Sequence, residues 1–214
     1  MSIEITNLKY SVKLNKHVNL NEVSQEINSE HSNNFKSILH SSFCVIREHG
    51  SSLRIILFKK KAHSILQHLN ITGLRDPFQF DKTLEKVAKL LKCNMHDFER
   101  VYVDNITTMS LYFKKTMDDL NVQKINLQKV ANIFETRFPD GQFTARFQPE
   151  TYSALIIKGG GSTNLLYSTG RNITIASRSL NQVQNIHDLL KSVLEEYFNY
   201  DQDVSDVVQS FRNY

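Results

Sequence analysis

The chain has 214 residues, of which 40% are hydrophobic, and a formal net charge of +4. This length allows one large domain or two small ones with a real core, and the mild positive charge is compatible with nucleic acid without indicating it. The two cysteines, Cys44 and Cys93, lie outside any CxxC or Cys/His cluster, which argues against a disulfide framework or a zinc site and favours a reducing compartment. Because the sequence shows neither a signal peptide nor an apolar run of about 18 residues, we expect a soluble intracellular protein.

Apolar periodicity predicts the elements of the first half. Helix 79–92 (QFDKTLEKVAKLLK) has Leu84, Val87 and Leu91 on one face. In chain order the expected elements are a strand at 3–14, a helix at 18–29, strands at 42–48, 53–59 and 64–72, and the helix at 79–92.

The second half repeats this order. We expect a strand at 100–113, a helix at 125–136, strands near 142–148, 153–158, 163–168 and 172–177, and a helix at 181–197. The recurrence of strand, helix, strands and helix indicates an internal repeat.

Matching positions support the repeat. Val18-Asn19-Leu20 precedes the first helix as Ile125-Asn126-Leu127 precedes its counterpart, and Asn7 has a counterpart in Asn105. Phe43 and Phe58 are 15 positions apart, as are Tyr152 and Tyr167, and each pair encloses one hairpin with a glycine-containing turn. The sequence therefore predicts two repeats, residues 1–98 and 99–214, in one compact pseudo-twofold domain.

This arrangement predicts a sheet face without helices, because two helices per repeat cover only one face. Strand alternation places the following residues together by strand: Asn7 with Lys9; Asn105 with Thr107, Met109 and Leu111; Ile56 with Phe58; Leu165 with Tyr167; and Ile173 with Ile175. An open face with this many apolar side chains indicates a partner surface.

Several motifs now point to one family. They are Thr6-Asn7-Leu8, Asp104-Asn105-Ile106, the run from Phe147 to Lys158 (FQPETYSALIIK), Leu165-Leu166-Tyr167, Thr169-Gly170-Arg171 and Ile175-Ala176-Ser177-Arg178. From Ile3 to about Tyr197 the chain resembles the core of the TATA-binding protein family. The resemblance implies an α+β saddle of two pseudo-symmetric repeats, each a curved antiparallel five-stranded sheet with two helices on its convex side.

The resemblance also implies a DNA-binding surface. Phe43, Phe58, Tyr152 and Tyr167 correspond to side chains that enter base steps, while Asn7 and Asn105 correspond to minor-groove donors. Residues expected near the groove are Lys9, Ile56, Thr72, Thr107, Leu165, Ile173 and Ile175, and those expected near phosphates are Lys61, Arg75, Lys158, Arg171 and Arg178.

By the same resemblance, Gln148 and Glu150 correspond to a segment that receives a transcription factor IIB-like partner. The implied function is that of a general initiation factor that binds and bends AT-rich promoter DNA and recruits RNA polymerase. It implies no active site, cofactor or metal, and a place in the nucleus or in a viral transcription compartment or virion.

Other interpretations remain open. The four aromatic residues are also compatible with core positions, and Lys59-Lys60-Lys61 is compatible with a solvated turn. Lys158–Thr163 superficially resembles a phosphate-binding loop, but it lacks the Gly-Lys-[Ser/Thr] order and no helix follows it, so a simple hairpin turn is the alternative. At the level of function, the alternatives are a scaffold that has lost DNA affinity and an accessory domain of an enzyme.

Overall fold

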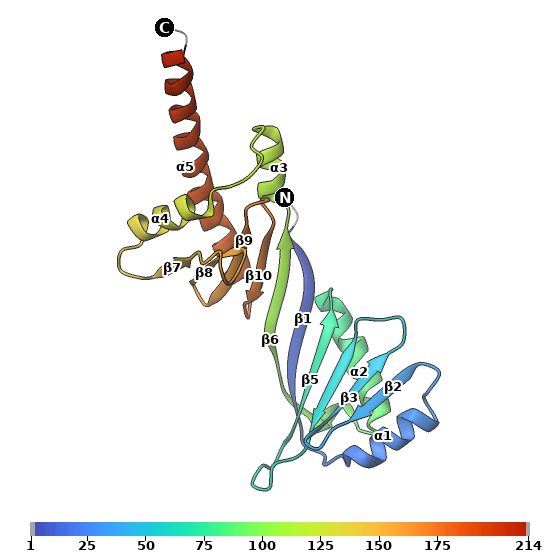
Figure 1. The fold of residues 1–214 in the computed structure, drawn as a ribbon. Helices are drawn as coiled ribbons and strands as arrows, with labels where there is room; N and C mark the ends of the chain where they lie inside the picture. Colours follow the sequence, from blue (N-terminus) through green and yellow to red (C-terminus); the bar gives the residue numbers. More distant parts are fainter. Residues whose placement is uncertain (1–2, 213–214) are drawn as a thin grey trace. The chain divides into compact units, whose positions relative to one another are not determined.

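The computed structural model describes residues 3–212, which form two compact units (Figure 1). The first unit is Ile5–Ile106, and the second consists of residues 3–4 and 107–212. The boundary at residues 98 and 99 remains a sequence-based prediction. Within the described residues, no helix has both the length and the hydropathy of a membrane span.

The first unit is an antiparallel sheet with two α-helices. In chain order its elements are β1 (Glu4–Leu14), α1 (Leu20–Ser29), β2 (Phe35–Leu39), β3 (Phe43–Glu48), β4 (Arg54–Phe58), β5 (Gln67–Leu74), the short 3-10 turn η1 (Pro77–Gln79), α2 (Phe80–Leu90), the short turn η2 (Met95–Asp97) and the beginning of β6 (Phe98–Ser110). The strand order is β2-β3-β4-β5-β1-β6.

Both helices of the first unit lie on the same face of its sheet. One cross-strand row reads Ser37, Ile46, Ile55, Ile71 and Tyr10, and all five are buried. At one end of the row, Ser24 of α1 bonds to Ser37 at 2.6 Å, and at the other end the ring of Phe80 in α2 stacks on Tyr10 with centroids 4.0 Å apart. Because strand side chains alternate between faces, the neighbouring rows belong to a face that neither helix covers.

The second unit repeats the plan. It contains the end of β6, α3 (Tyr112–Asp119), α4 (Leu127–Arg137), β7 (Phe143–Arg146), β8 (Ala154–Gly159), β9 (Ser162–Tyr167), β10 (Asn172–Ala176) and α5 (Leu180–Arg212), with strand order β6-β10-β9-β8-β7. Leu155, Ile157 and Leu166 of the sheet share one core with Phe134 of α4 and Leu190 of α5.

Near β10, the helix-covered face of the second unit carries buried amide and hydroxyl side chains that bond to one another. The side chains of Asn164 and Asn172 are buried and exchange hydrogen bonds of 3.1 and 2.9 Å. Asn164 also donates to Thr174 at 3.1 Å. His187 of α5 is 2% exposed and contacts Ser110 through Nε2 at 3.2 Å. Burial lowers the pKa of His187, so its neutral form is favoured in this core.

The resemblance predicts the α+β class and the antiparallel five-strand plan of each repeat correctly, whereas the residue pattern misses two elements. β2 is a five-residue strand with little alternation, which its pairing with β3 defines. The expected strand 100–113 ends at Ser110, and α3 begins at Tyr112, whose N–H donates to the Ser110 hydroxyl at 3.2 Å. The expected helix 181–197 is longer and reaches Arg212.

Candidate nucleic-acid interface

The helix-free face of the first unit has three cross-strand rows. The basic row is Lys36, Arg47, Arg54, Thr72 and Lys9; the middle row is Ile38, Val45, Ile56, Asn70 and Ser11; and the aromatic row contains Phe43, Phe58 and His68 and ends at Lys13. Cations thus line one border of this face, while apolar side chains lie in the middle row on β2, β3 and β4. Of the sequence-predicted groove residues, the structure places Lys9, Phe43, Ile56, Phe58 and Thr72 together here.

Asn7 is fixed at the end of the basic row. Its Oδ1 accepts the hydroxyl of Thr72 at 2.9 Å and the backbone N–H of Gly73 at 2.7 Å. Since these two bonds use the acceptor of the side-chain amide, the polar group that Asn7 can offer a ligand is its NH2 donor. Asn105, on β6, is half-buried.

Lys9 and Asn70 place polar groups on the helix-free face of the first unit. The ammonium of Lys9 lies 2.5 Å from the carboxylate of Asp104, and its side chain is 34% exposed. Asn70 is buried and its Oδ1 accepts from Ser11 at 2.9 Å and lies 2.8 Å from Nε2 of His68. The opposite ring nitrogen of His68 lies 2.8 Å from the Lys13 ammonium. These contacts form one continuous polar network from Ser11 to Lys13.

The helix-free face of the second unit is more apolar. Its central cross-strand row reads Arg146, Ile156, Leu165, Ile173 and Met109. Leu165 is buried between its neighbours at 7% exposure, while Ile156, Ile173 and Met109 are half-buried. Thr107 is half-buried on β6, and Ile175 is 40% exposed beside an irregularity in the pairing of β10.

The row positions support the internal repeat. Leu165 and Ile173 pair in the second unit as Ile56 and Asn70 do in the first. By the same comparison Met109 corresponds to Ser11, and the same offset in residue number relates Asn105 to Asn7. The polar Ser11 and Asn70 therefore stand where the other repeat has Met109 and Ile173.

The two aromatic pairs do not occupy equal registers, although their spacing in sequence is equal. Phe43 is the direct cross-strand partner of Phe58, whereas the partner of Tyr167 is Ala154 and Tyr152 precedes β8 by two residues. The reason is the turn: residues 49–53 connect β3 and β4, whereas Gly160 and Gly161, with φ of 55° and 75°, connect β8 and β9. By register, Ser41 is the counterpart of Tyr152.

Each pair nevertheless brings its two rings together. The centroids of Phe43 and Phe58 lie 6.1 Å apart, and the hydroxyls of Tyr152 and Tyr167 lie 3.1 Å apart. That hydrogen bond raises the pKa of the Tyr167 phenol. The guanidinium of Arg171 lies 6.0 Å from the Tyr167 ring centroid, which joins a cation to the pair.

The residues expected near phosphates and partners lie on the surface. Lys61, Arg75, Lys158, Arg171 and Arg178 are all exposed. Gln148 and Glu150 are exposed between β7 and β8, where the Gln148 carbonyl accepts the N–H groups of Thr151 and Tyr152 at 3.0 and 2.9 Å. These bonds give the segment a defined turn.

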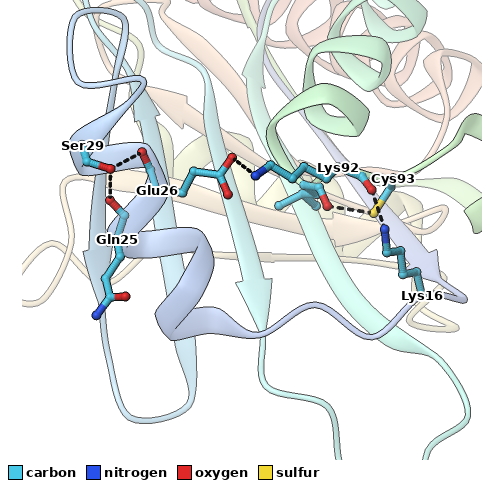
Figure 2. Close-up of polar contacts among 7 residues, drawn as sticks. Lys16, Gln25, Glu26, Ser29, Lys92 and Cys93 are labelled. Atoms are coloured by element: carbon cyan, nitrogen blue, oxygen red, sulfur yellow. Dashed lines mark hydrogen bonds and ion pairs between the residues drawn. The ribbon is translucent and has the colours of Figure 1, made fainter.

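Three potential metal-ligand atoms, from Glu26, Glu30 and His31, lie within 4.8 Å of one another. The Nζ of Lys92 already lies 2.8 Å from Glu26, as Figure 2 shows. Lys16 in turn donates to the Lys92 carbonyl at 2.5 Å. Because Lys92 supplies the positive charge beside Glu26, we interpret this group as a link between α1 and the end of α2 and assign no metal to it.

Comparison with known proteins gives one clear result. No family sequence model matches the chain, and no curated protein matches it in sequence. Its structure is similar to that of Methanococcus jannaschii TBP, with a TM-score of 0.64, 14% sequence identity and coverage of 92% of this chain and 99% of that chain. The chain has the TATA-binding-protein fold.

On this TATA-binding-protein fold, sequence reasoning missed part of the helix-free face. Lys36, Arg47 and Arg54 are exposed in the basic row, and Lys13 and His68 belong to the aromatic row. The available signal was alternation, because each of these residues lies next to a buried residue on its strand. What sequence could not give was the pairing that aligns them across neighbouring strands.

Proposed function

We propose that this protein is a transcription initiation factor that binds AT-rich duplex DNA on the helix-free faces of its sheets, enters the minor groove and bends the DNA. The observation on which the proposal depends is the helix-free face of the first unit. There the hydrogen-bonded Asn7 amide and the apolar and aromatic side chains lie beside the basic row. The TATA-binding-protein fold supports the same role.

The chemistry of this face suits the minor groove. Adenine N3 and thymine O2 are acceptors, and Asn7 presents a donor because Thr72 and Gly73 already occupy its acceptor. Ile56 and Val45 provide apolar contact nearby. No amino group of guanine obstructs the floor of an AT-rich groove, so apolar side chains can approach it closely.

Bending requires wedges and charge. Apolar wedges between base steps kink a duplex by about 20–90° at a cost of a few kcal/mol per step. Phe43 and Phe58 suit this task better than Tyr152 and Tyr167, since inserting a phenol breaks the hydroxyl pair and buries its oxygens. The exposed Lys36, Arg47 and Arg54 of the basic row can neutralise phosphates.

Partner recruitment is the finer part of the proposal. The turn from Gln148 to Tyr152 presents Glu150 to solvent in a defined conformation, and we propose that a transcription factor IIB-like protein docks there on the way to RNA polymerase recruitment. Glu150→Arg is then expected to abolish capture of such a partner on DNA while leaving binary DNA binding unchanged. The nucleus or a viral transcription compartment is the corresponding location.

A scaffold role is the second candidate, and the polar network of Ser11, Asn70 and His68 favours it. These side chains satisfy one another in place of the apolar surface that the second unit has at Met109 and Ile173. A face of this kind binds DNA less tightly, and a protein partner would then be its ligand.

Paired variants test DNA bending by fluorescence transfer on end-labelled AT-rich duplexes. Phe43→Ala with Phe58→Ala is expected to abolish bending, whereas Tyr152→Phe with Tyr167→Phe is expected to preserve or increase it, because two hydroxyls that resist insertion are removed. Equal effects of the two pairs would contradict the wedge assignment. Absence of duplex binding by the parent protein, even at low salt and with transcription partners, would favour the scaffold.

A further inference from the structure

The first unit has a longer connection than its counterpart in the second unit: an eight-residue loop, residues 59–66, between β4 and β5. The corresponding connection in the second unit, residues 168–171, has four. The loop begins with Lys59, Lys60 and Lys61, and its Ile65 side chain is 81% exposed.

A cavity of about 710 Å³ lies under this loop, within the usual size range of ligand sites. Its walls combine four lysines, Lys13, Lys59, Lys60 and Lys61, with the ring of Phe58 and with His68. An ammonium group suits a phosphate, whereas an aromatic wall suits a planar apolar ring. A single cavity with both therefore fits a nucleotide better than an isolated anion.

The aromatic row, extended by His40, leads to this cavity along the helix-free face. His40 stacks on Phe43 with centroids 4.4 Å apart, Phe43 lies 6.1 Å from Phe58, and Phe58 meets His68 edge-on at 5.3 Å. The two phenylalanines are half-buried, so part of each ring remains accessible. Rows of aromatic rings beside a basic groove are typical of surfaces on which unpaired bases stack.

The surroundings hold both walls in place. The buried side chain of Gln67 donates to the Phe58 carbonyl at 2.9 Å and bonds to both backbone groups of Val18, which fixes the end of the loop. Lys13 lies 2.8 Å from Nδ1 of His68. Burial lowers the pKa of His68, so the neutral ring accepts the Lys13 proton donor and the ammonium stays at the wall of the cavity.

We propose that the cavity and the aromatic row form a binding site for single-stranded DNA, in which a base stacks on Phe58 and Phe43 and the adjoining phosphates meet Lys13 and Lys59–Lys61. The site accepts a strand whose bases are unpaired, and it shares Phe43, Phe58 and Lys61 with the proposed duplex surface, so a single strand and a duplex should compete for it. It gives this protein a contact with melted DNA in addition to its proposed duplex site.

The test uses the full chain and a labelled oligothymidylate of about 10 nucleotides, with fluorescence anisotropy as the readout. Phe43→Leu with Phe58→Leu keeps apolar volume but removes the aromatic faces, and we expect about a five- to 150-fold loss of affinity. Lys60→Gln with Lys61→Gln should reduce the slope of log affinity against log salt by about 0.7 per lysine. The matched control, Lys115→Gln with Lys124→Gln, removes two exposed lysines of the second unit that lie outside the proposed DNA surfaces, and it should leave the affinity unchanged.

A second measurement places the strand without any variant. Ultraviolet crosslinking of the parent protein to the oligothymidylate, followed by peptide mapping, should identify the segment with Phe58 and Lys59–Lys61. Failure of the parent to bind the oligonucleotide at low salt, crosslinks confined to the second unit, or unchanged affinity in the phenylalanine variant would overturn the proposal. Duplex bending can survive each of these results, so the failure of one site is distinguishable from the failure of the other.

Discussion

Variants of Asn7 can separate its contribution to folding stability from its contribution to DNA binding. Its Oδ1 accepts from the Thr72 hydroxyl and the Gly73 backbone N–H, at 2.9 and 2.7 Å. Asn7→Ala leaves both donors without this acceptor in a half-buried site and should cost about 1–3 kcal/mol of unfolding free energy. Asn7→Asp keeps an acceptor of the same shape, and its carboxylate can accept both bonds, so its stability should stay within about 1 kcal/mol of the parent.

The two variants should nevertheless both lose DNA affinity. Asn7→Asp has no NH2 donor and places a negative charge against groove acceptors, so we expect at least a tenfold weaker complex with an AT-rich duplex, which is about 1.4 kcal/mol. Urea denaturation measures the first quantity and fluorescence anisotropy the second. An Asn7→Asp protein that binds the duplex as tightly as the parent would refute the assignment of Asn7 as a groove donor.

Three further predictions concern backbone strain, pH and salt. Gly73→Ala should lower the unfolding free energy by at least about 3 kcal/mol in urea, since its φ is +93° and the new Cβ would clash with the backbone oxygen of Ser52; Gly50→Ala, with φ of +70° and open space, should lose only about 1 kcal/mol. His187 has a lowered pKa in the folded state, so its contribution to stability is complete above the unfolded pKa of 6.5 and is lost as the pH falls below it. In thermal unfolding from pH 7.5 to 5, His187→Asn should therefore reduce the fall of the melting temperature with pH. An unchanged pH dependence would contradict the assignment. Arg171→Ala should weaken duplex binding on all sequences and reduce its salt slope by about 1; an effect confined to one sequence would argue against a phosphate contact.

The sequence predicted which side chains share a face better than it predicted which ones meet across strands. Alternation is a local property, so Ile56 and Phe58 could be placed on one side from their spacing alone. Register depends on turns. Both aromatic pairs are 15 residues apart, but a five-residue connection lies between Phe43 and Phe58 and a two-residue glycine turn between Tyr152 and Tyr167. As a result, Tyr152 lies two positions away from the register that Phe43 occupies.

The polar contacts on the helix-free face show the same limit. Ser11, Asn70 and His68 are separated by up to 59 residues in sequence, and only the pairing of β1 with β5 joins them into a network. The sequence places Lys9 on the groove-facing side of its strand, but only the structure shows that its ammonium is paired with Asp104. The repeat and the fold class therefore follow from local pattern, and the chemistry of the face follows from long-range pairing.

The most direct test of the proposed function is the bend angle of an end-labelled AT-rich duplex, measured by fluorescence transfer as the full-length protein is added across a salt series. The proposal predicts saturable, salt-sensitive binding with a bend within about 20–90° and greater affinity for a prebent duplex than for a straight one. Binding without bending, or no binding at low salt in the presence of transcription partners, would contradict it.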